Sequence, residues 1–311
     1  MIVKKNNFNQ KIYKNIVNEK INKFKLSDLM VSIEPSNICN ARCVMCPYSK
    51  MIRKKEIMSM DFFKKIADDC LSNGIKNFNF NFYNEPFLDP LIFERIKFLK
   101  SKGARVQFFS NASVVDKEKA KQILDSGLDE IIFSIDSIKK KNYELIRKGL
   151  DFNITTKNIL ELIKQRKILC LNKPKIKLNY VEQKLNQGEL KKFQSFWADK
   201  VDKIYISRDD QRNKEPRYYR NGNNIKSDFP CLRIWSELIV MSNGKVPLCC
   251  VDYDGEIILG DFNKQTLKEI WNNNIFKRIR KLHLDFKADQ VPLCKKCLNS
   301  YRMNIKIIDH N

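Results

Sequence analysis

The chain has 311 residues, of which 43% are hydrophobic and 11% aromatic, so it can bury a sizeable core in one or two domains. Its formal net charge is +23, and it contains only two histidines. This composition excludes a histidine-based catalytic triad and a multi-histidine metal site. No apolar run approaches the 18 residues that a membrane helix needs, so we expect no membrane span.

The ten cysteines are expected to be reduced. The first residues lack the apolar stretch of a signal peptide, so we expect a cytoplasmic protein whose thiols serve metals or catalysis. The lysines are spread along the chain rather than gathered into one tract, so we interpret the charge as solvated and expect no nucleic-acid partner. No glycine forms a Gly-x-Gly pair, so the Rossmann fingerprint and the P-loop are absent.

Residues 1–28 are basic and predict a helical extension. From residue 29 to 207, short β-type runs alternate with helical segments, and six β/α units in a row predict a parallel α/β sheet or barrel. The predicted strands are Leu29–Glu34, Asn77–Tyr83, Arg105–Ser110, Glu130–Ile135, Lys175–Val181 and Lys203–Ile206. The predicted helices are Met60–Ser72, Pro90–Ser101, Lys117–Asp125, Thr156–Lys167 and Gly188–Ala198.

The loop after the first predicted strand carries three cysteines in close succession. Cys39, Cys43 and Cys46 stand at C-x3-C-x2-C spacing. Three thiolates this close can hold three irons of a cubane cluster and leave the fourth iron open to substrate or cofactor. A closed zinc site takes four ligands, usually as two pairs, so zinc fits this motif poorly.

The cysteine motif resembles the Cys-x3-Cys-x-Φ-Cys hallmark of the radical S-adenosylmethionine (SAM) enzymes, with Met45 in the apolar Φ position. The resemblance implies that Cys39, Cys43 and Cys46 bind a [4Fe–4S] cluster whose open iron takes the amino and carboxylate groups of SAM. One electron then cleaves SAM to methionine and a 5′-deoxyadenosyl radical, which abstracts hydrogen from a substrate. The resemblance also implies a partial (β/α)6 barrel and an electron donor such as flavodoxin or ferredoxin.

The second predicted strand alternates strictly between asparagine and phenylalanine from Asn77 to Phe82. Fully buried parallel strands are usually apolar on both faces. The alternation therefore predicts that the phenylalanines pack under the helices while the asparagines face a wet barrel lumen. The alternative is an edge strand with one side in solvent.

Polar motifs follow successive strands, at the barrel end where such enzymes bind ligands. Tyr83-Asn84-Glu85-Pro86 resembles the family's Gly-Gly-Glu-Pro segment, which binds the methionyl ammonium of SAM, and a carboxylate suits a cation. Ser110-Asn111 resembles the family's Thr-Asn-Gly turn, with Ala112 in place of glycine, and Ser134-Ile135-Asp136 resembles its Ser-x-Asp motif near the SAM carboxylate and ribose. The SAM-binding residues that the resemblance implies are Met45, Asn84, Glu85, Ser110, Asn111, Ser134 and Asp136.

Residues 208–230 are polar without an apolar period and predict a linker or a loop that covers the active site. Beyond them, Ser236–Pro247 predicts a β-hairpin, because Asn243-Gly244 is a strong turn signal. Leu267–Leu284 predicts one helix, and residues 301–311 predict a tail.

Two cysteine pairs stand in the C-terminal part of the chain. The hairpin would bring Cys231 and Cys249 together, and Cys294 and Cys297 form the second pair. Two separated pairs fit either zinc or a four-cysteine [4Fe–4S] cluster. The spacing alone favours zinc, and the upstream cysteine motif favours iron–sulfur.

The segment from Cys231 through Gly244 to Cys249 resembles the start of the SPASM/twitch extension of radical SAM proteins, which we expect over residues 231–300. This C-terminal part has only five cysteines, too few for the full seven-cysteine pattern with two auxiliary clusters. The resemblance therefore implies one auxiliary [4Fe–4S] cluster, used for electron transfer, with Cys250 as an alternative to Cys249. Its implied ligands are Cys231, Cys249, Cys294 and Cys297.

Three functions are open at this point. The first is a radical SAM oxidoreductase for a small molecule, similar to twitch-domain dehydrogenases that oxidise a secondary alcohol of an aminocyclitol, so a sugar or polyol is the first candidate substrate. Its catalytic residues are unknown. The oxidation also needs a base, for which an Arg or Lys within residues 208–226 is a candidate, although nothing in the sequence singles one out. The second is a peptide- or protein-modifying maturase. The third is a non-enzymatic iron–sulfur or zinc protein that binds nucleic acid.

Overall fold

The computed structural model describes residues 19, 21, 23–208 and 231–297. Its strands are β1 (Met30–Ile33), β2 (Asn77–Asn79), β3 (Arg105–Ser110), β4 (Glu130–Ser134), β5 (Lys175–Glu182), β6 (Lys203–Arg208), β7 (Glu237–Val240), β8 (Lys245–Pro247) and β9 (Ile258–Asp261). Its α-helices are α2 (Met60–Ser72), α3 (Ile92–Ser101), α4 (Lys117–Asp125), α5 (Lys140–Ile146), α6 (Phe152–Ile168), α7 (Leu190–Trp197), α8 (Arg233–Ser236), α9 (Leu267–Asn272), α10 (Asn274–Leu284) and α11 (Pro292–Lys296).

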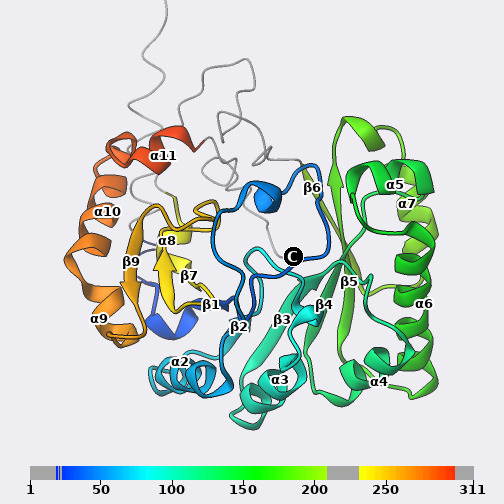
Figure 1. Cartoon of the computed structure of the whole chain (residues 1–311), viewed down its shortest axis with the longest axis horizontal. Coiled ribbons are helices and arrows are strands. Elements are labelled where there is room, and N and C mark those ends of the chain that lie inside the picture. The colour runs from blue at the N-terminus through cyan, green and yellow to red at the C-terminus, as the bar shows by residue number, and fades with distance from the viewer. Residues whose placement is uncertain (1–18, 20, 22, 209–230, 298–311) are drawn as a thin grey trace, which may run out of the picture.

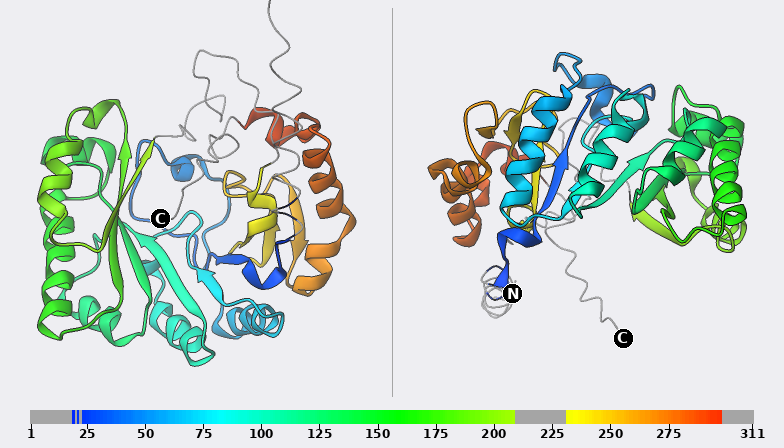
Figure 2. Two further views of the ribbon diagram at one scale, coloured as in Figure 1. Left: turned by 180° about the vertical axis from the view of Figure 1, so that it is seen from behind. Right: turned by 90° about the horizontal axis from the view of Figure 1, so that it is seen from below.

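Seven of these strands form one parallel sheet, in the order β6-β5-β4-β3-β2-β1-β7. From β1 to β6 the order in space follows the order in the chain, as is usual for consecutive elements. These strands are all parallel because each crossover returns the chain to the same end of the sheet. The sheet curves, and helices α2, α3, α4 and α6 lie along its outer side (Figures 1 and 2). The predicted partial (β/α)6 barrel is confirmed, and β7 extends its sheet by one strand.

The helices begin where capping side chains stand in the sequence. The Ser59 hydroxyl accepts a hydrogen bond from the Phe62 N–H (3.2 Å) at the start of α2, and Asp116 accepts one from the Lys119 N–H (2.8 Å) at the start of α4. Helix α2 buries the apolar face that contains Phe63 and Ile66. The predicted boundaries of α2 and α4 are therefore confirmed.

The alternating second strand, β2, lies inside the sheet rather than at its edge. It pairs with β1 on one side and β3 on the other, so the edge-strand alternative is wrong. Phe78 and Phe80 are fully buried, and the Phe80 ring lies 5.6 Å from the Phe63 ring of α2. On the other face, the half-buried Asn79 donates a hydrogen bond to the hydroxyl of Ser32 on β1 (3.4 Å).

Strand β2 is shorter than predicted because a side chain replaces the backbone ladder. The amide of Asn81 donates to the carbonyl of Phe109 (2.8 Å) and accepts from the N–H of the same residue. Asn81 thus pairs with β3 through its side chain, and the backbone is released to turn toward residues 83–86.

The predicted hairpin over Ser236–Pro247 is wrong, although its turn forms. The Gly244 N–H donates to the Met241 carbonyl (2.8 Å), but β7 pairs in parallel with β1 and β8 pairs in antiparallel fashion with β9. Three consecutive residues of β7, Leu238 to Val240, are buried, as expected for a strand covered on both faces. The C-terminal segment therefore shares its first strand with the barrel sheet.

The predicted single helix over Leu267–Leu284 is also wrong. Asn273 has extended backbone geometry (ψ 165°), and it separates α9 from α10. Its side chain accepts a hydrogen bond from the Phe276 N–H (2.8 Å) and donates one to the Leu259 carbonyl (2.5 Å). Asparagine is a favoured N-cap, so a new helix begins here.

Some expectations fall on residues outside the described ranges. They are most of the helical extension over 1–28, the linker over 208–230 except Arg208, which belongs to β6, and the tail over 301–311. Among the described helices, none is long and apolar enough to cross a membrane.

Candidate active site

Three of the predicted SAM-binding residues converge where β2 and β3 end. The Glu85 carboxylate accepts hydrogen bonds from the Ser110 hydroxyl (2.8 Å) and the Asn111 N–H (2.6 Å), and a third from the Phe87 N–H (3.2 Å). Glu85, Ser110 and Asn111 are all buried. The carboxyl ends of neighbouring parallel strands thus bring together residues that are 25 positions apart in the chain.

Burial dominates the electrostatics of Glu85. Desolvation raises the pKa of its carboxyl to about 7, although the hydrogen bonds from Asn111, Ser110 and Phe87 oppose the shift. A buried carboxyl of this kind exchanges a proton near neutral pH and becomes a stable anion when a cation approaches. This is the property that the binding of an ammonium group requires.

The turn after β3 keeps the backbone shape that glycine gives in the family motif. Ala112 has a φ of +60°, in the left-handed region that costs an L-residue roughly 1–2 kcal/mol. Its N–H donates to the Ser110 hydroxyl (3.0 Å). The departure from glycine at this position is therefore accommodated as backbone strain, and the turn still presents Asn111 to Glu85.

The cysteine loop is fastened to this strand end. The Asn111 amide donates to the carbonyl oxygen of the Asn40 side chain (2.9 Å), and Asn40 donates in turn to the Ser113 hydroxyl (2.8 Å). The Tyr48 hydroxyl accepts a hydrogen bond from the Cys39 N–H (2.8 Å). The loop that carries the first cysteine is thus held beside the Glu85 carboxylate.

The three cysteines of the motif lie close enough to affect one another. Burial raises the pKa of the Cys39 thiol to about 12, and the neighbouring Glu85, Cys43 and Cys46 add to the rise. The Cys39 sulfur accepts a hydrogen bond from the Ala41 N–H (3.5 Å). A bound metal centre would deprotonate such thiols outright.

Arg147 supplies a positive charge to the same cysteine loop. Its guanidinium lies 3.6 Å from the Cys43 sulfur and donates to the Asp136 carboxylate (2.5 Å). An N–H donor on each of two motif sulfurs is the environment that thiolate ligands of an iron–sulfur cluster need. The donor set therefore fits a [4Fe–4S] cluster on Cys39, Cys43 and Cys46.

Asp136 holds this arginine in place. One carboxylate oxygen of Asp136 binds Arg147, the other accepts the Val181 N–H (2.8 Å), and the residue is fully buried. The sequence predicted a contact of Asp136 with SAM and not its pairing with Arg147, because the spacing of eleven positions between the two residues gave no distinctive signal.

The other predicted SAM residues stay predictions. Met45 is half-buried, and Asn84 braces the turn by donating to the Phe80 carbonyl (3.0 Å). Ser134 lies at the end of β4, in register with Asn179 of β5, and Asn179 accepts a hydrogen bond from the Ser207 hydroxyl on β6 (2.8 Å). Asn179 on β5 and Ser207 on β6 add two further polar side chains beside these strand ends. They were not predicted, because no sequence motif surrounds them.

The Tyr83 side chain contacts the loop that carries Cys249 and Cys250. Its hydroxyl donates to the Cys250 carbonyl (2.7 Å), and its ring lies 5.7 Å from the Tyr253 ring. Together with Tyr48 these rings form a small buried cluster against which Cys39 and Cys46 pack. The tyrosine that stands in place of a family glycine thus connects the two cysteine-bearing loops.

A buried ion pair makes a second connection. Arg53 donates to both carboxylate oxygens of Glu34 (2.6 and 2.9 Å), at side-chain exposures of 7% and 0%. It also donates to the Tyr253 carbonyl (2.6 Å). The strand end of β1, the segment after the cysteine motif and the loop after Cys250 are therefore one connected unit.

The C-terminal cysteines also gather. Burial raises the pKa of the Cys249 thiol well above its usual range, and Cys250, Cys297 and Cys294 add to the rise. The Cys231 N–H donates to the imidazole of His283 on α10 (3.2 Å). Within the described ranges no group of Cys, His, Asp and Glu forms a site for a metal ion. A cubane instead takes one thiolate at each iron, so both cysteine sets remain candidate cluster ligands.

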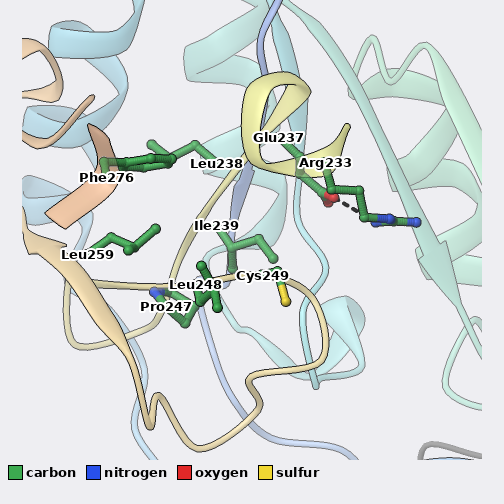
Figure 3. A pocket seen from close by; sticks show the side chains of 9 residues that line it. All are labelled: Arg233, Glu237, Leu238, Ile239, Pro247, Leu248, Cys249, Leu259 and Phe276. Carbon is green, nitrogen blue, oxygen red and sulfur yellow. Dashed lines mark hydrogen bonds and ion pairs between the residues drawn. The ribbon is translucent and has the colours of Figure 1, made fainter. Parts of the chain in front are cut away.

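A small cavity lies beside Cys249, between β7 and β9 (Figure 3). Its volume is about 10 Å³, which is at most the space of one water molecule. Arg233 and Glu237 form an ion pair at its rim (2.7 Å). The cavity is therefore too small to be a substrate site.

Two family models match the chain. The first is described as the Radical SAM superfamily and matches residues 33–172, and the second is described as an iron–sulfur cluster-binding domain, SPASM, and matches residues 231–298. The first domain implies SAM and a [4Fe–4S] cluster, and the second implies additional iron–sulfur clusters. The first match includes Cys39, Cys43 and Cys46, and the second includes the C-terminal cysteines.

Curated relatives share part or most of the chain. The tungsten-containing aldehyde ferredoxin oxidoreductase cofactor-modifying protein of Pyrococcus furiosus is 26% identical over 51% of this chain and 45% of its own length. The chain thus spans about half the length of the first curated relatives that it matches. The S-adenosyl-L-methionine-dependent 2-deoxy-scyllo-inosamine dehydrogenase of Niallia circulans is 20% identical over 87% of this chain and 92% of its own length.

Solved structures share the fold. BtrN in complex with AdoMet and 2-DOIA superimposes with a TM-score of 0.60 at 18% identity, covering 87% of this chain and 92% of BtrN. SuiB of Streptococcus suis, bound to the precursor peptide SuiA, gives 0.66 at 14% identity, covering 86% of this chain and 70% of SuiB. With both family models matched on a parallel α/β sheet, the chain belongs to the radical SAM superfamily and is a radical SAM enzyme with a C-terminal SPASM domain.

Proposed function

We propose that this enzyme oxidises a hydroxyl group of a small, hydroxyl-rich molecule to a ketone. The observation that carries the proposal is the near end-to-end match, 92% of its length, with a SAM-dependent inosamine dehydrogenase. A second observation supports it, since the cysteines near Cys249 are enough for one closed auxiliary cluster with four thiolates.

The residues of this chain have separate tasks in the proposed reaction. When bound, SAM and a cluster on Cys39, Cys43 and Cys46 would supply radical chemistry that removes a hydrogen atom from the alcohol carbon, and a cluster on the C-terminal cysteines would supply an acceptor for the second electron. The remaining hydroxyl proton goes to a base, for which an Arg or Lys of residues 208–226 stays a prediction, and all of these residues except Arg208 lie outside the described ranges. Glu85 orients the SAM ammonium, and Asp136 holds Arg147 against the Cys43 sulfur.

The inner face of the sheet suits a neutral, hydroxylated substrate. Its half-buried side chains include the amides of Asn79 and Asn179 and the hydroxyl of Ser207. Amides and hydroxyls both donate and accept hydrogen bonds, so they can pair with successive hydroxyl groups. We therefore propose that these residues face the substrate.

The test is a deuterium-transfer assay. The reconstituted protein is incubated anaerobically with SAM, dithionite and aminocyclitols, among them 2-deoxy-scyllo-inosamine, with deuterium on each carbinol carbon in turn. We expect deuterium in 5′-deoxyadenosine from one position, together with one ketone per 5′-deoxyadenosine. A protein that cleaves SAM without deuterium transfer from any polyol would contradict the proposal.

Peptide modification is the second candidate, favoured by the fold likeness to the SuiB–SuiA complex. Here the chain covers only 70% of SuiB, so a part of that protein has no counterpart in the alignment. In the same assay, a deuterated precursor peptide that transfers its label while the polyols do not would establish peptide modification instead.

A further inference from the structure

Ile52, six residues after the last cysteine of the motif, is held out into solvent. Its side chain is 86% exposed, the highest value among the large apolar side chains of the described residues. Exposed apolar side chains are common singly, so exposure alone means little. The setting of this one is unusual in two further respects, its rigidity and its charge.

The backbone around Ile52 is fixed from several sides. The Ile52 N–H donates to the Asp254 carboxylate (2.9 Å), and the next residue, Arg53, is bound by the buried Glu34. The Lys54 carbonyl accepts from the Asn37 amide (2.7 Å). The exposed isoleucine therefore sits on an anchored segment rather than on a mobile loop, and its apolar surface is presented permanently.

Apart from the Asp254 carboxylate that binds the Ile52 N–H, the charged side chains next to Ile52 in the sequence are basic. Residues 49–55, which we name the basic loop, read Ser-Lys-Met-Ile-Arg-Lys-Lys and contain four cations and no acid. Lys54 and Lys55 are exposed, whereas Arg53 is neutralised by Glu34. A rigid apolar centre within a cationic rim is the pattern of a protein-docking site for an acidic partner.

The position of the basic loop identifies the kind of partner. Ile52 follows Cys46 by six residues, so its Cα lies within about 20 Å of the Cα of a cluster ligand. Each SAM cleavage consumes one electron at this cluster, and an outside donor must supply it for the first turnover. We propose that the basic loop docks an acidic one-electron carrier protein of the flavodoxin class, with Ile52 at the centre of the contact.

The electron balance of the proposed contact is simple. The carrier's flavin hydroquinone gives one electron and becomes the semiquinone, the oxidised cluster becomes reduced by one electron, and the carrier dissociates. Opposite charges on the two surfaces speed the encounter, so the rate falls as salt screens them.

The test measures cluster reduction without any substrate, so it is independent of the proposed alcohol oxidation. The reconstituted full chain is mixed with flavodoxin hydroquinone, and cluster bleaching is followed by stopped flow at low and high salt. We expect Ile52→Asp and the double variant Lys54→Glu/Lys55→Glu to slow reduction by about tenfold or more. Titanium(III) citrate, a small reductant, is expected to reduce wild type and variants equally, which also verifies their cluster content.

Matched controls lie on the outer helices. Ile168→Asp changes an isoleucine that is 67% exposed at the end of α6, and Lys117→Glu/Lys121→Glu changes two exposed lysines of α4. We expect both controls to keep the wild-type rate with flavodoxin. The proposal is overturned if the basic-loop variants keep that rate, or if they lose single-stranded nucleic-acid binding while flavodoxin reduction is unchanged.

Discussion

The ionisation of Glu85 gives SAM binding a pH dependence that follows from the structure. Burial raises the pKa of this carboxyl to about 7, so about one tenth of the molecules carry the carboxylate at pH 6 and about nine tenths at pH 8. If the SAM amino group binds the carboxylate form of Glu85, the contribution of Glu85 lowers the apparent Kd about tenfold from pH 6 to pH 8, which equals roughly 1.4 kcal/mol. Anaerobic isothermal titration calorimetry of the reconstituted enzyme measures this change.

Glu85→Gln is the matched control, because it keeps the shape of the side chain and cannot ionise. The amino group of SAM titrates equally in both experiments, so the ratio of the two Kd values isolates Glu85. We expect the variant to bind about 10- to 100-fold more weakly at pH 8, from the loss of a charge-assisted hydrogen bond. That difference should shrink about tenfold at pH 6. Parallel pH curves for the two proteins would refute the assignment of Glu85 to the SAM ammonium.

Three further predictions concern the connections around the cysteines. Arg53→Met leaves the buried carboxylate of Glu34 without its partner and should lower the free energy of unfolding in urea by about 3–5 kcal/mol, whereas a loss below 1 kcal/mol would contradict the role of the pair. Arg147→Gln removes a positive charge beside a ligand sulfur and should lower the reduction potential of the first cluster in EPR-monitored titration, at unchanged iron content. Cys249→Ala should remove about four irons per chain and Cys250→Ala none, and the reverse result would exchange their roles.

Local features of the fold could be predicted from the sequence. Ser59 and Asp116 mark helix starts because a capping side chain acts within three residues of its own position. The faces of β2 follow from the Asn-Phe alternation for the same reason, since neighbouring side chains of a strand point to opposite faces. The cysteine motif is similarly local, so its spacing and its resemblance to the family hallmark were enough to predict a cluster site there.

Long-range features could not be predicted in the same way. An Asn-Gly turn specifies a reversal of the chain but not the partner of each strand, and β7 pairs with β1 although some 200 residues separate them. The contact of Tyr83 with the Cys250 carbonyl likewise depends on tertiary packing. The break at Asn273 had a signal, because three consecutive asparagines, residues 272–274, are poor helix formers and good caps.

The most direct test of the account is the iron content of two proteins. Wild type and a variant with Cys39, Cys43 and Cys46 all changed to alanine are purified anaerobically and reconstituted with iron and sulfide. We predict about eight irons per wild-type chain and about four in the variant, one cubane for each cysteine set. About four irons in both proteins would leave only the C-terminal cluster, and zinc without iron would contradict the account as a whole.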